Sequence, residues 1–180
     1  MVYVLLGKGF EETEAIAPVD LLRRAGVPVV TVGIGGKVIE GGHGIGVAAD
    51  ITLEEVDLTQ LEMVVLPGGL GGVASTQASQ EALDLIRFAW ANGKQVAAIC
   101  AGPTILASLG ITDGLEVTCY PGCEAQMGSA KYIPGVPCVT SGRVITGTSA
   151  GCAVPFGLAL VAALKGQDAA DAIARQIVIY

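Results

Sequence analysis

The residue that points most clearly to chemistry is Cys100. It follows the apolar run of residues 96–99 and precedes Ala101-Gly102-Pro103, after which apolar residues recur at helical spacing up to Leu109. This pattern predicts a buried strand, a tight corner and a helix that begins near Pro103. A nucleophile elbow has this geometry, and the helix N-terminus is expected to lower the pKa of the thiol. The alternative is a buried structural cysteine, because free cysteines are among the most buried residues.

A second candidate is a carboxyl group on the first predicted helix. Glu11, Glu12 and Glu14 follow the first predicted strand. On a helical wheel Glu14 falls within the apolar arc, so its side chain is predicted to point inward. A carboxyl group in apolar surroundings has a raised pKa, which suits a proton shuttle. The alternative is that these acidic residues only complement the dipole at the helix N-terminus.

The segment Pro67-Gly68-Gly69 follows another buried strand and allows three interpretations. It could be only a turn. It could cradle a phosphate group, although residues 68–72 match neither the G-x-G-x-x-G pattern nor a P-loop. It could also present a bare backbone N–H that forms an oxyanion hole together with the N–H of Ala101.

The rest of the chain supplies the elements that must position these residues. Apolar runs predict strands at residues 2–6, 27–34, 63–66, 96–99, 116–119 and 138–145, and apolar spacing predicts helices at 11–25, 81–90, 153–164 and 168–177. Residues 37–49 are expected to form a hairpin extension, and residues 53–58 a short helix or loop. This alternation predicts an α/β fold in a single domain of residues 1–180, with a doubly wound, mostly parallel sheet covered by helices on both faces. The loops 7–14, 67–72 and 100–102 should meet at the carboxyl ends of the strands.

Composition argues against several classes of function. The net charge is −7 and the ten basic residues are scattered, so no nucleic-acid partner is expected. Residues 144–164 carry no charge and are long enough to span a membrane. Their Gly, Ser and Thr residues and Pro155 instead predict a strand, a loop and a buried helix, so no membrane partner is expected. The first eight residues lack a basic leader, which favours a cytoplasmic protein.

The cysteine count argues for reduced thiols. The five cysteines are Cys100, Cys119, Cys123, Cys138 and Cys152. An odd number in a chain of 180 residues does not suggest a disulfide framework. Only one histidine, His43, accompanies the C-x3-C pair, so no metal site is expected. Cys138 is predicted to lie in the core, and Cys119 and Cys123, which flank Tyr120, are either structural or secondary oxidation sites. Cys152 stands at the start of a predicted helix, so it is either structural or an acidic thiol near the site.

Three segments resemble the ThiJ/PfpI superfamily, namely residues 8–15 (KGFEETEA), 65–69 (VLPGG) and 97–103 (AAICAGP). The chain is most similar to the branch of glyoxalase/deglycase and redox-chaperone proteins, which includes the parkinsonism-associated deglycase, and the similarity covers essentially the whole chain. The resemblance implies a flavodoxin-like sandwich and a homodimer. It also implies a nucleophilic, readily oxidised cysteine at Cys100 with Glu14 as the partner carboxyl group.

The resemblance further implies a reaction without cofactor, metal or glutathione. The Cys100 thiolate would attack the aldehyde of methylglyoxal, or of its early protein adducts, and give a hemithioacetal. Glu14 would shuttle protons, the N–H groups of Gly69 and Ala101 would hold the oxyanion, and lactate would be the product. A different function, an oxidative-stress sensor or chaperone, would depend on oxidation of Cys100 to a sulfinate stabilised by protonated Glu14.

Two positions depart from the family pattern. Tyr120 stands where family members often carry His, and it could orient a substrate but is a poor base at neutral pH. Ala101 follows Cys100 where protease-like members place a His, so a Cys–His dyad is absent and a peptidase is disfavoured. Gly68, Tyr120 and His43 are predicted to line the substrate pocket. His43 roughly matches a position where relatives place a basic residue near the partner subunit's site.

Overall fold

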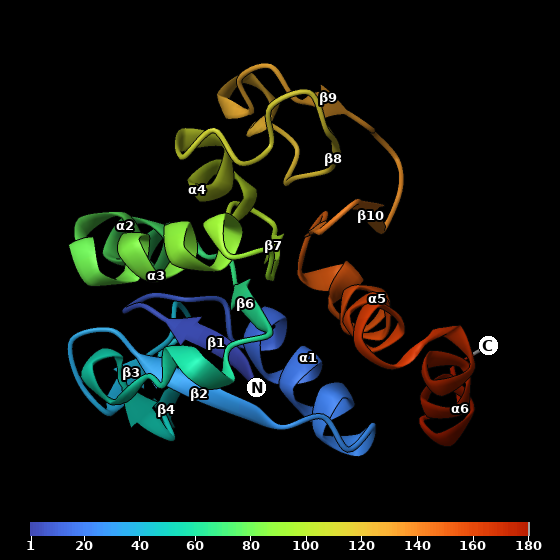
Figure 1. Cartoon of the computed structure of the whole chain (residues 1–180), viewed down its shortest axis with the longest axis horizontal. Helices are drawn as coiled ribbons and strands as arrows, with labels where there is room; N and C mark the ends of the chain where they lie inside the picture. The colour runs from blue at the N-terminus through green and yellow to red at the C-terminus, as the bar shows by residue number, and fades with distance from the viewer. Residues whose placement is uncertain (180) are drawn as a thin grey trace.

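The computed structural model describes residues 1–179 and is built around a seven-stranded sheet (Figure 1). Tyr180, the last residue of the predicted domain, lies outside the described residues. The strands lie in the order β10 (Cys138–Ser141), β11 (Val144–Gly147), β7 (Gln95–Ile99), β6 (Met63–Leu66), β1 (Val2–Leu6), β2 (Val29–Gly33) and β5 (Ile51–Thr52). Only β10, at one edge, runs antiparallel to its neighbour. The mostly parallel, doubly wound sheet expected from the sequence is therefore confirmed.

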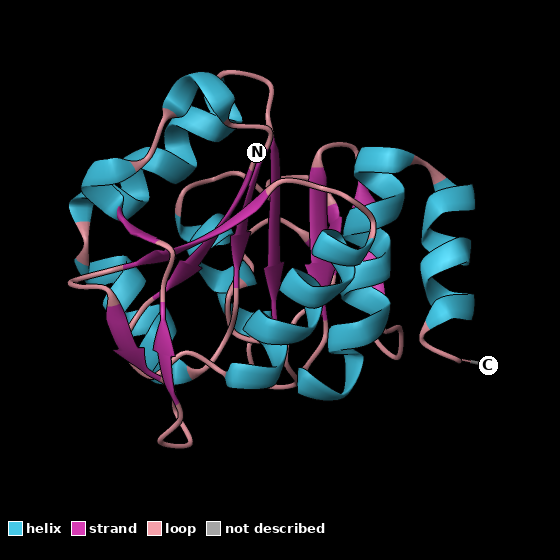
Figure 2. Ribbon diagram, turned by 90° about the horizontal axis from the view of Figure 1, so that it is seen from below, coloured by secondary structure: helices cyan, strands magenta, loops and turns pink. Residues whose placement is uncertain are grey.

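Helices cover both faces of this sheet (Figure 2). The helices of one face are α1 (Glu12–Arg24) and α5 (Ala153–Lys165), with α6 (Gln167–Gln176) packed on α5, and those of the other face are α2 (Leu70–Ala78), α3 (Gln80–Ala91) and α4 (Pro103–Ser108). In β1, Val4 packs in the first layer, whereas Tyr3 and Leu5 pack in the second. This alternation follows the pleat of the strand. Burial on both faces explains why the strands read as continuous apolar runs.

Two smaller sheets flank the central one. The predicted hairpin extension is present as β3 (Val38–Glu40) and β4 (Gly46–Ala48). A second pair joins β8 (Glu116–Val117) to β9 (Lys131–Tyr132). The strand predicted at residues 116–119 is thus shorter and lies outside the central sheet. Beyond Val117, the Thr118 N–H donates to the side-chain hydroxyl of Thr146 on β11.

Several other elements differ from the sequence prediction. Helix α2 was not predicted, because it contains two glycines and its apolar residues do not recur at helical spacing. Residues 138–147 form two strands joined by a turn at Gly142, and Cys138 is half-buried on the edge strand instead of in the core. Residues 53–60 form two short 3₁₀ turns, Leu53–Glu55 and Leu58–Gln60.

The uncharged segment 144–164 forms β11, a 3₁₀ turn and most of α5, as predicted. Within residues 1–179, no helix has both the length and the apolar character needed to cross a membrane.

Candidate active site

Cys100 occupies a strained corner at the carboxyl end of β7. Its φ angle is 65°, in the left-handed region that residues other than glycine rarely adopt. The backbone is fixed on both sides, because the Cys100 N–H donates to the Gly147 carbonyl at 3.0 Å and the Cys100 carbonyl accepts from the Tyr120 N–H at 2.9 Å. Helix α4 begins at Pro103. The predicted strand, corner and helix are therefore present.

The Glu14 side chain reaches this corner from α1. It is 0% exposed, so the inward orientation predicted from the helical wheel is confirmed. Its Oε2 accepts a 2.8 Å hydrogen bond from the Gly68 N–H, whereas its Oε1 is buried and has no hydrogen-bond partner among the described residues. The carboxyl group lies close enough to the Cys100 thiol for each group to shift the pKa of the other. Helix α1 is held at this end by Glu11, whose Oε2 accepts from the Glu14 N–H at 2.7 Å. Helix α1 and the loop at Gly68 thus hold one carboxyl group beside the Cys100 thiol.

The Gly68–Gly69 peptide directs a donor at the same sulfur. The Gly68 carbonyl accepts from the Glu11 N–H at 3.0 Å. The N–H groups of Gly69 and Ala101 lie near enough to the Cys100 thiol to lower its pKa. Because the C=O and N–H of a planar trans peptide point in opposite directions, the bond from Glu11 turns the Gly69 N–H toward Cys100. Gly69 itself has a φ of 83°, which favours glycine. The donors of the predicted oxyanion hole therefore lie at the predicted nucleophile.

Burial raises the pKa of Glu14 to about 7, and the charge of Glu11 adds to this, whereas hydrogen bonds from Cys100 and Gly68 oppose it. Burial also raises the pKa of the Cys100 thiol to about 12, together with the charge and hydrogen bond of Glu14. The N–H groups of Ala101 and Gly69 lower the pKa of the thiol, but by less than burial and Glu14 raise it. The prediction that the helix N-terminus lowers the pKa of this thiol was therefore wrong. Burial beside a carboxylate outweighs the dipole of the six-residue helix α4.

This electrostatic arrangement makes Cys100 and Glu14 a proton-sharing pair. Two adjacent negative charges in a buried site are costly, so the thiol loses its proton readily only when Glu14 accepts it. A carboxyl group with a pKa of about 7 is partly ionised near neutral pH and can both accept and return a proton. The pair can therefore generate a thiolate at the moment of attack without holding a free thiolate at rest.

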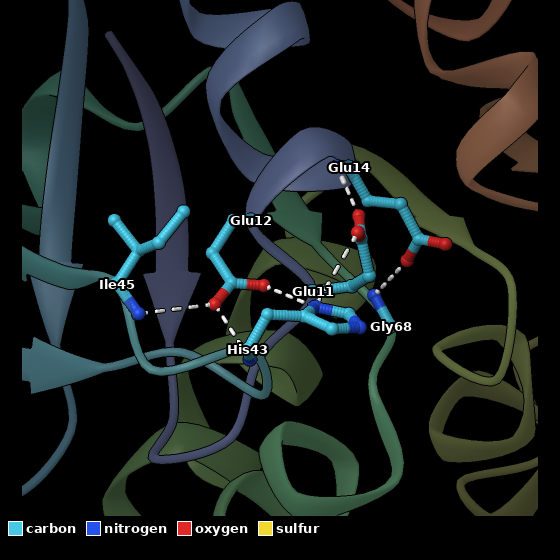
Figure 3. Close-up of polar contacts among 6 residues, drawn as sticks. All are labelled: Glu11, Glu12, Glu14, His43, Ile45 and Gly68. Atoms are coloured by element: carbon cyan, nitrogen blue, oxygen red, sulfur yellow. Dashed lines mark hydrogen bonds and ion pairs between the residues drawn. The ribbon is translucent and has the colours of Figure 1, made fainter.

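Glu12 and His43 form a second polar cluster beside this pair (Figure 3). One oxygen of the buried Glu12 carboxylate accepts from the backbone N–H of His43 at 2.8 Å and of Ile45 at 3.4 Å. The other oxygen lies 2.8 Å from Nδ1 of the His43 ring. Burial acts against the charge of Glu12, yet the hydrogen bonds from His43 hold the pKa of its carboxyl group below the usual value. The same contact raises the pKa of His43.

This second cluster fixes the hairpin to α1 and is separate from the Cys100–Glu14 pair. Glu11, Glu12 and His43 each bring one ligand-type atom within 4.8 Å of the others. Both oxygens of Glu12 already accept hydrogen bonds, and the cluster lies at a helix N-terminus, which disfavours cations. We therefore assign it a structural role. His43 was predicted to line the pocket, but its hydrogen bonds go to Glu12.

These contacts and the fold allow a comparison with known proteins. The sequence pattern of the DJ-1/PfpI family matches residues 1–163. The chain belongs to the DJ-1/PfpI family. Within this family it is 34% identical over 178 residues to protein dj-1beta of Drosophila melanogaster, an alignment that covers 98% of this chain and 95% of the relative. It is also 34% identical over 157 residues to a protein named deglycase from Pyrococcus abyssi, covering 87% of this chain and 92% of that protein.

Solved structures of DJ-1 proteins share the fold over the full chain. The crystal structure of D. melanogaster DJ-1beta has a TM-score of 0.95 and 33% sequence identity, and the match covers 99% of this chain and 97% of that one. The oxidised form of Toxoplasma gondii DJ-1 has a TM-score of 0.94 and 28% sequence identity, and the match covers 99% of this chain and 98% of that one. The flavodoxin-like α/β fold expected from the resemblance is therefore confirmed.

The remaining predicted residues of this DJ-1/PfpI chain lie around the pair. Tyr120 is joined to Cys100 through its backbone, and its side chain is half exposed. Sequence reasoning missed the roles of Glu11 and Glu12. The available signal was the position of Glu11 three residues before Glu14, which is the spacing of a helix N-cap. No comparable signal joined Glu12 to the hairpin, because that contact exists only in the folded chain.

Proposed function

We propose that this chain is a cysteine-dependent glyoxalase/deglycase that works without a cofactor. Its substrates would be 2-oxoaldehydes of the methylglyoxal type or their early protein adducts. The observation that carries the proposal is the position of Glu14, whose buried carboxyl group has a pKa of about 7 and lies beside the thiol at a strained corner. The relative from P. abyssi that is named a deglycase supports the same class of reaction.

In the proposed first step, the Cys100 sulfur attacks the aldehyde carbon of methylglyoxal while the thiol proton passes to Glu14. A C–S bond forms and the carbonyl oxygen becomes an oxyanion. The N–H groups of Gly69 and Ala101 would bind this oxyanion, since both point toward the sulfur. Glu14 would then return the proton to the oxyanion, which gives the hemithioacetal.

Conversion to lactate requires two further proton transfers. The hydrogen on the former aldehyde carbon leaves as a proton and is delivered to the neighbouring carbonyl carbon, and the hydroxyl proton of the hemithioacetal passes to the oxygen of that carbonyl group, which together produce a lactoyl thioester on Cys100. Water then hydrolyses the thioester, releases lactate and restores the thiol. No electrons enter or leave, so an external oxidant or reductant is not needed. Glu14 is the residue proposed to carry the proton, because its carboxyl group lies beside the reacting sulfur.

The substrate pocket in this proposal includes Gly68 and Tyr120, with His43 at its margin. The proposal also keeps the homodimer that the resemblance implies. Ile16 on α1 and Val38 and Ile45 on the hairpin are 43%, 75% and 57% exposed, and such apolar side chains favour coverage by a second copy. Its need for reduced thiols fits the cytoplasmic location expected from the sequence.

The test is turnover of methylglyoxal and of glycated peptides by the purified, reduced protein. We expect the wild type to form lactate, and the Cys100→Ala and Glu14→Gln variants to lose activity by a factor of about 100 or more. Cys138→Ala is the matched control, because Cys138 is also a half-buried free cysteine but lies on the edge strand. Full activity of Cys100→Ala, or no turnover by the wild type, would rule out the proposal.

A second candidate function is a redox sensor or chaperone. The same N–H groups that point at the sulfur would stabilise a Cys100 sulfinate, with a protonated Glu14 as a further donor. This function predicts that mild peroxide oxidises Cys100 selectively and changes partner binding. Equal oxidation of all five thiols would contradict it. A peptidase stays disfavoured, since the one histidine of the chain bonds Glu12, and we expect no hydrolysis of casein.

A further inference from the structure

An open groove lies between the segment 52–58 and helix α3, and its lining includes none of the Cys100 site residues. It consists of two adjoining cavities of about 390 Å³ and 470 Å³. Leu53 and Glu81 line both cavities, so the two are continuous. One wall is the chain that follows the edge strand β5, and the other is α3. The groove therefore runs along the side of the sheet that is remote from β10.

One end of the groove is apolar. Five of its seven lining side chains are apolar, namely Val56 and Leu58 on one wall, Leu85 and Phe88 on the other, and Leu53 between the two cavities; Glu81 and Asp84 of α3 complete the lining. Leu58 is 40% exposed, although a leucine in a closed core would be fully buried. Apolar surface that stays open to water in a concave site favours an apolar ligand group.

The other end is acidic. Glu54 and Glu81 stand on opposite walls, above the glycine-rich turn of residues 33–36, where small residues leave room for a long side chain. Both carboxylates are exposed, and within residues 1–179 neither has a cationic group at ion-pair distance. Asp84, farther along α3, is paired with Arg87 at 3.0 Å. The unpaired negative charge is thus concentrated at Glu54 and Glu81.

We propose that this groove binds an extended peptide segment of another protein in which a lysine or arginine lies two residues from an aliphatic or aromatic residue, so that both side chains point to the same side. The cationic side chain lies between Glu54 and Glu81, and the apolar side chain fills the cavity lined by Val56, Leu58 and Phe88. Charge complementarity selects this occupant, because an acidic peptide would be repelled and a purely apolar one would leave the acidic end unpaired. The proposal does not depend on chemistry at Cys100.

Binding is measured by fluorescence anisotropy with a short fluorescein-labelled peptide in which a lysine and a leucine stand two residues apart, titrated with the full chain. We expect saturable binding that weakens as salt is added. The Glu54→Lys/Glu81→Lys variant should bind more than about tenfold more weakly. The Glu40→Lys/Asp168→Lys variant carries the same change in net charge at exposed positions outside the groove, and its affinity should stay within about twofold of the wild type.

Peptide and fold controls separate the possible outcomes. A peptide with glutamate in place of lysine, and one with serine in place of leucine, should both fail to bind. If circular dichroism shows that the Glu54→Lys/Glu81→Lys variant is unfolded, Glu54→Gln/Glu81→Gln replaces it. This variant should also bind the peptide more weakly than the wild type. Equal weakening by the control pair, or equal binding of the serine peptide, would overturn the proposal. A change of oligomeric mass in the groove variants would also overturn it, since the occupant would then be a second copy.

Discussion

The N–H of Gly68 donates a 2.8 Å hydrogen bond to Oε2 of Glu14, and Gly68 lies so close to Cys100 that a Cβ at this position would be 2.6 Å from the Cys100 Cβ. One glycine thus sets the separation between the carboxyl group and the thiol. A side chain at this position would force the two apart, so the pair depends on a residue that has none.

Gly68→Ala should therefore abolish activity. The new Cβ would lie 2.5 Å from Oε2 of Glu14 as well as against Cys100, and it would displace the carboxyl group from the sulfur. The control is Gly46→Ala on the exposed strand β4, where a Cβ would find its nearest neighbour at 4.0 Å. Lactate formation by the two variants is the measurement. Comparable rates for both would show that the Gly68 contact is not needed.

Glu14→Gln should change how stability depends on pH. Burial raises the pKa of Glu14 to about 7 in the folded chain, whereas the usual glutamate value of 4.5 applies to the unfolded chain, so the folded state loses stability as pH rises between these values. The wild type should lose about 2 kcal/mol relative to Glu14→Gln between roughly pH 5.5 and pH 8. Urea unfolding at both pH values measures this. Glu40→Gln is an exposed control and should lose as much stability between the two pH values as the wild type. If Glu14→Gln also lost as much as the wild type, the raised pKa of Glu14 would be contradicted.

Glu11→Gln should shift the pH dependence of activity to lower pH. The proposed mechanism needs the Glu14 carboxylate, so the rate should rise with pH around the pKa of Glu14, and the charge of Glu11 raises that pKa. Glutamine keeps an acceptor for the Glu14 N–H but removes the charge. Glu11→Ala removes both and should also lower the free energy of unfolding by about 1 kcal/mol through the lost helix cap. A pH midpoint of activity that stays unchanged in Glu11→Gln would show that its charge does not act on Glu14.

His43 should titrate at a raised pKa because of Glu12. It is the only histidine, so its imidazole NMR signals are unambiguous. The hydrogen bond and charge of Glu12 raise the pKa of His43, and the ion pair is therefore present at low pH and lost as pH rises through that pKa. Glu12→Gln should lower the pKa of His43 toward its usual value, whereas Glu40→Gln should leave the pKa of His43 unchanged. An identical midpoint in wild type and Glu12→Gln would remove Glu12 as the cause.

The sequence was informative where local pattern determines structure. The apolar run before Cys100, the small residues after it and Pro103 locate the corner, because each has a strong local preference. The helical wheel places Glu14 inward for the same reason, since burial of the apolar face fixes the rotation of the helix. Helix α2 escaped prediction because its glycines have poor helix propensity and only its packing against the core stabilises it.

The electrostatics of the site could not be read in the same way. The expected low thiol pKa followed from a helix N-terminus alone, whereas the thiol pKa is raised according to how closely Glu14 and the surrounding core approach the sulfur. The bond from Glu12 to the tip of the hairpin joins residues 31 positions apart, and nothing in either local sequence requires it. Long-range contacts of this kind set proton affinities, and they arise only in the folded chain.

The most direct test of the Cys100–Glu14 pair is mass spectrometry of the protein quenched in acid during turnover of methylglyoxal. The wild type should carry one added methylglyoxal mass, on the peptide that contains Cys100, because the hemithioacetal and the lactoyl thioester are isomers. Glu14→Gln should accumulate little of this adduct, since the thiol has no base. An adduct on another residue, or unchanged adduct formation in Glu14→Gln, would contradict the proposed roles of both residues.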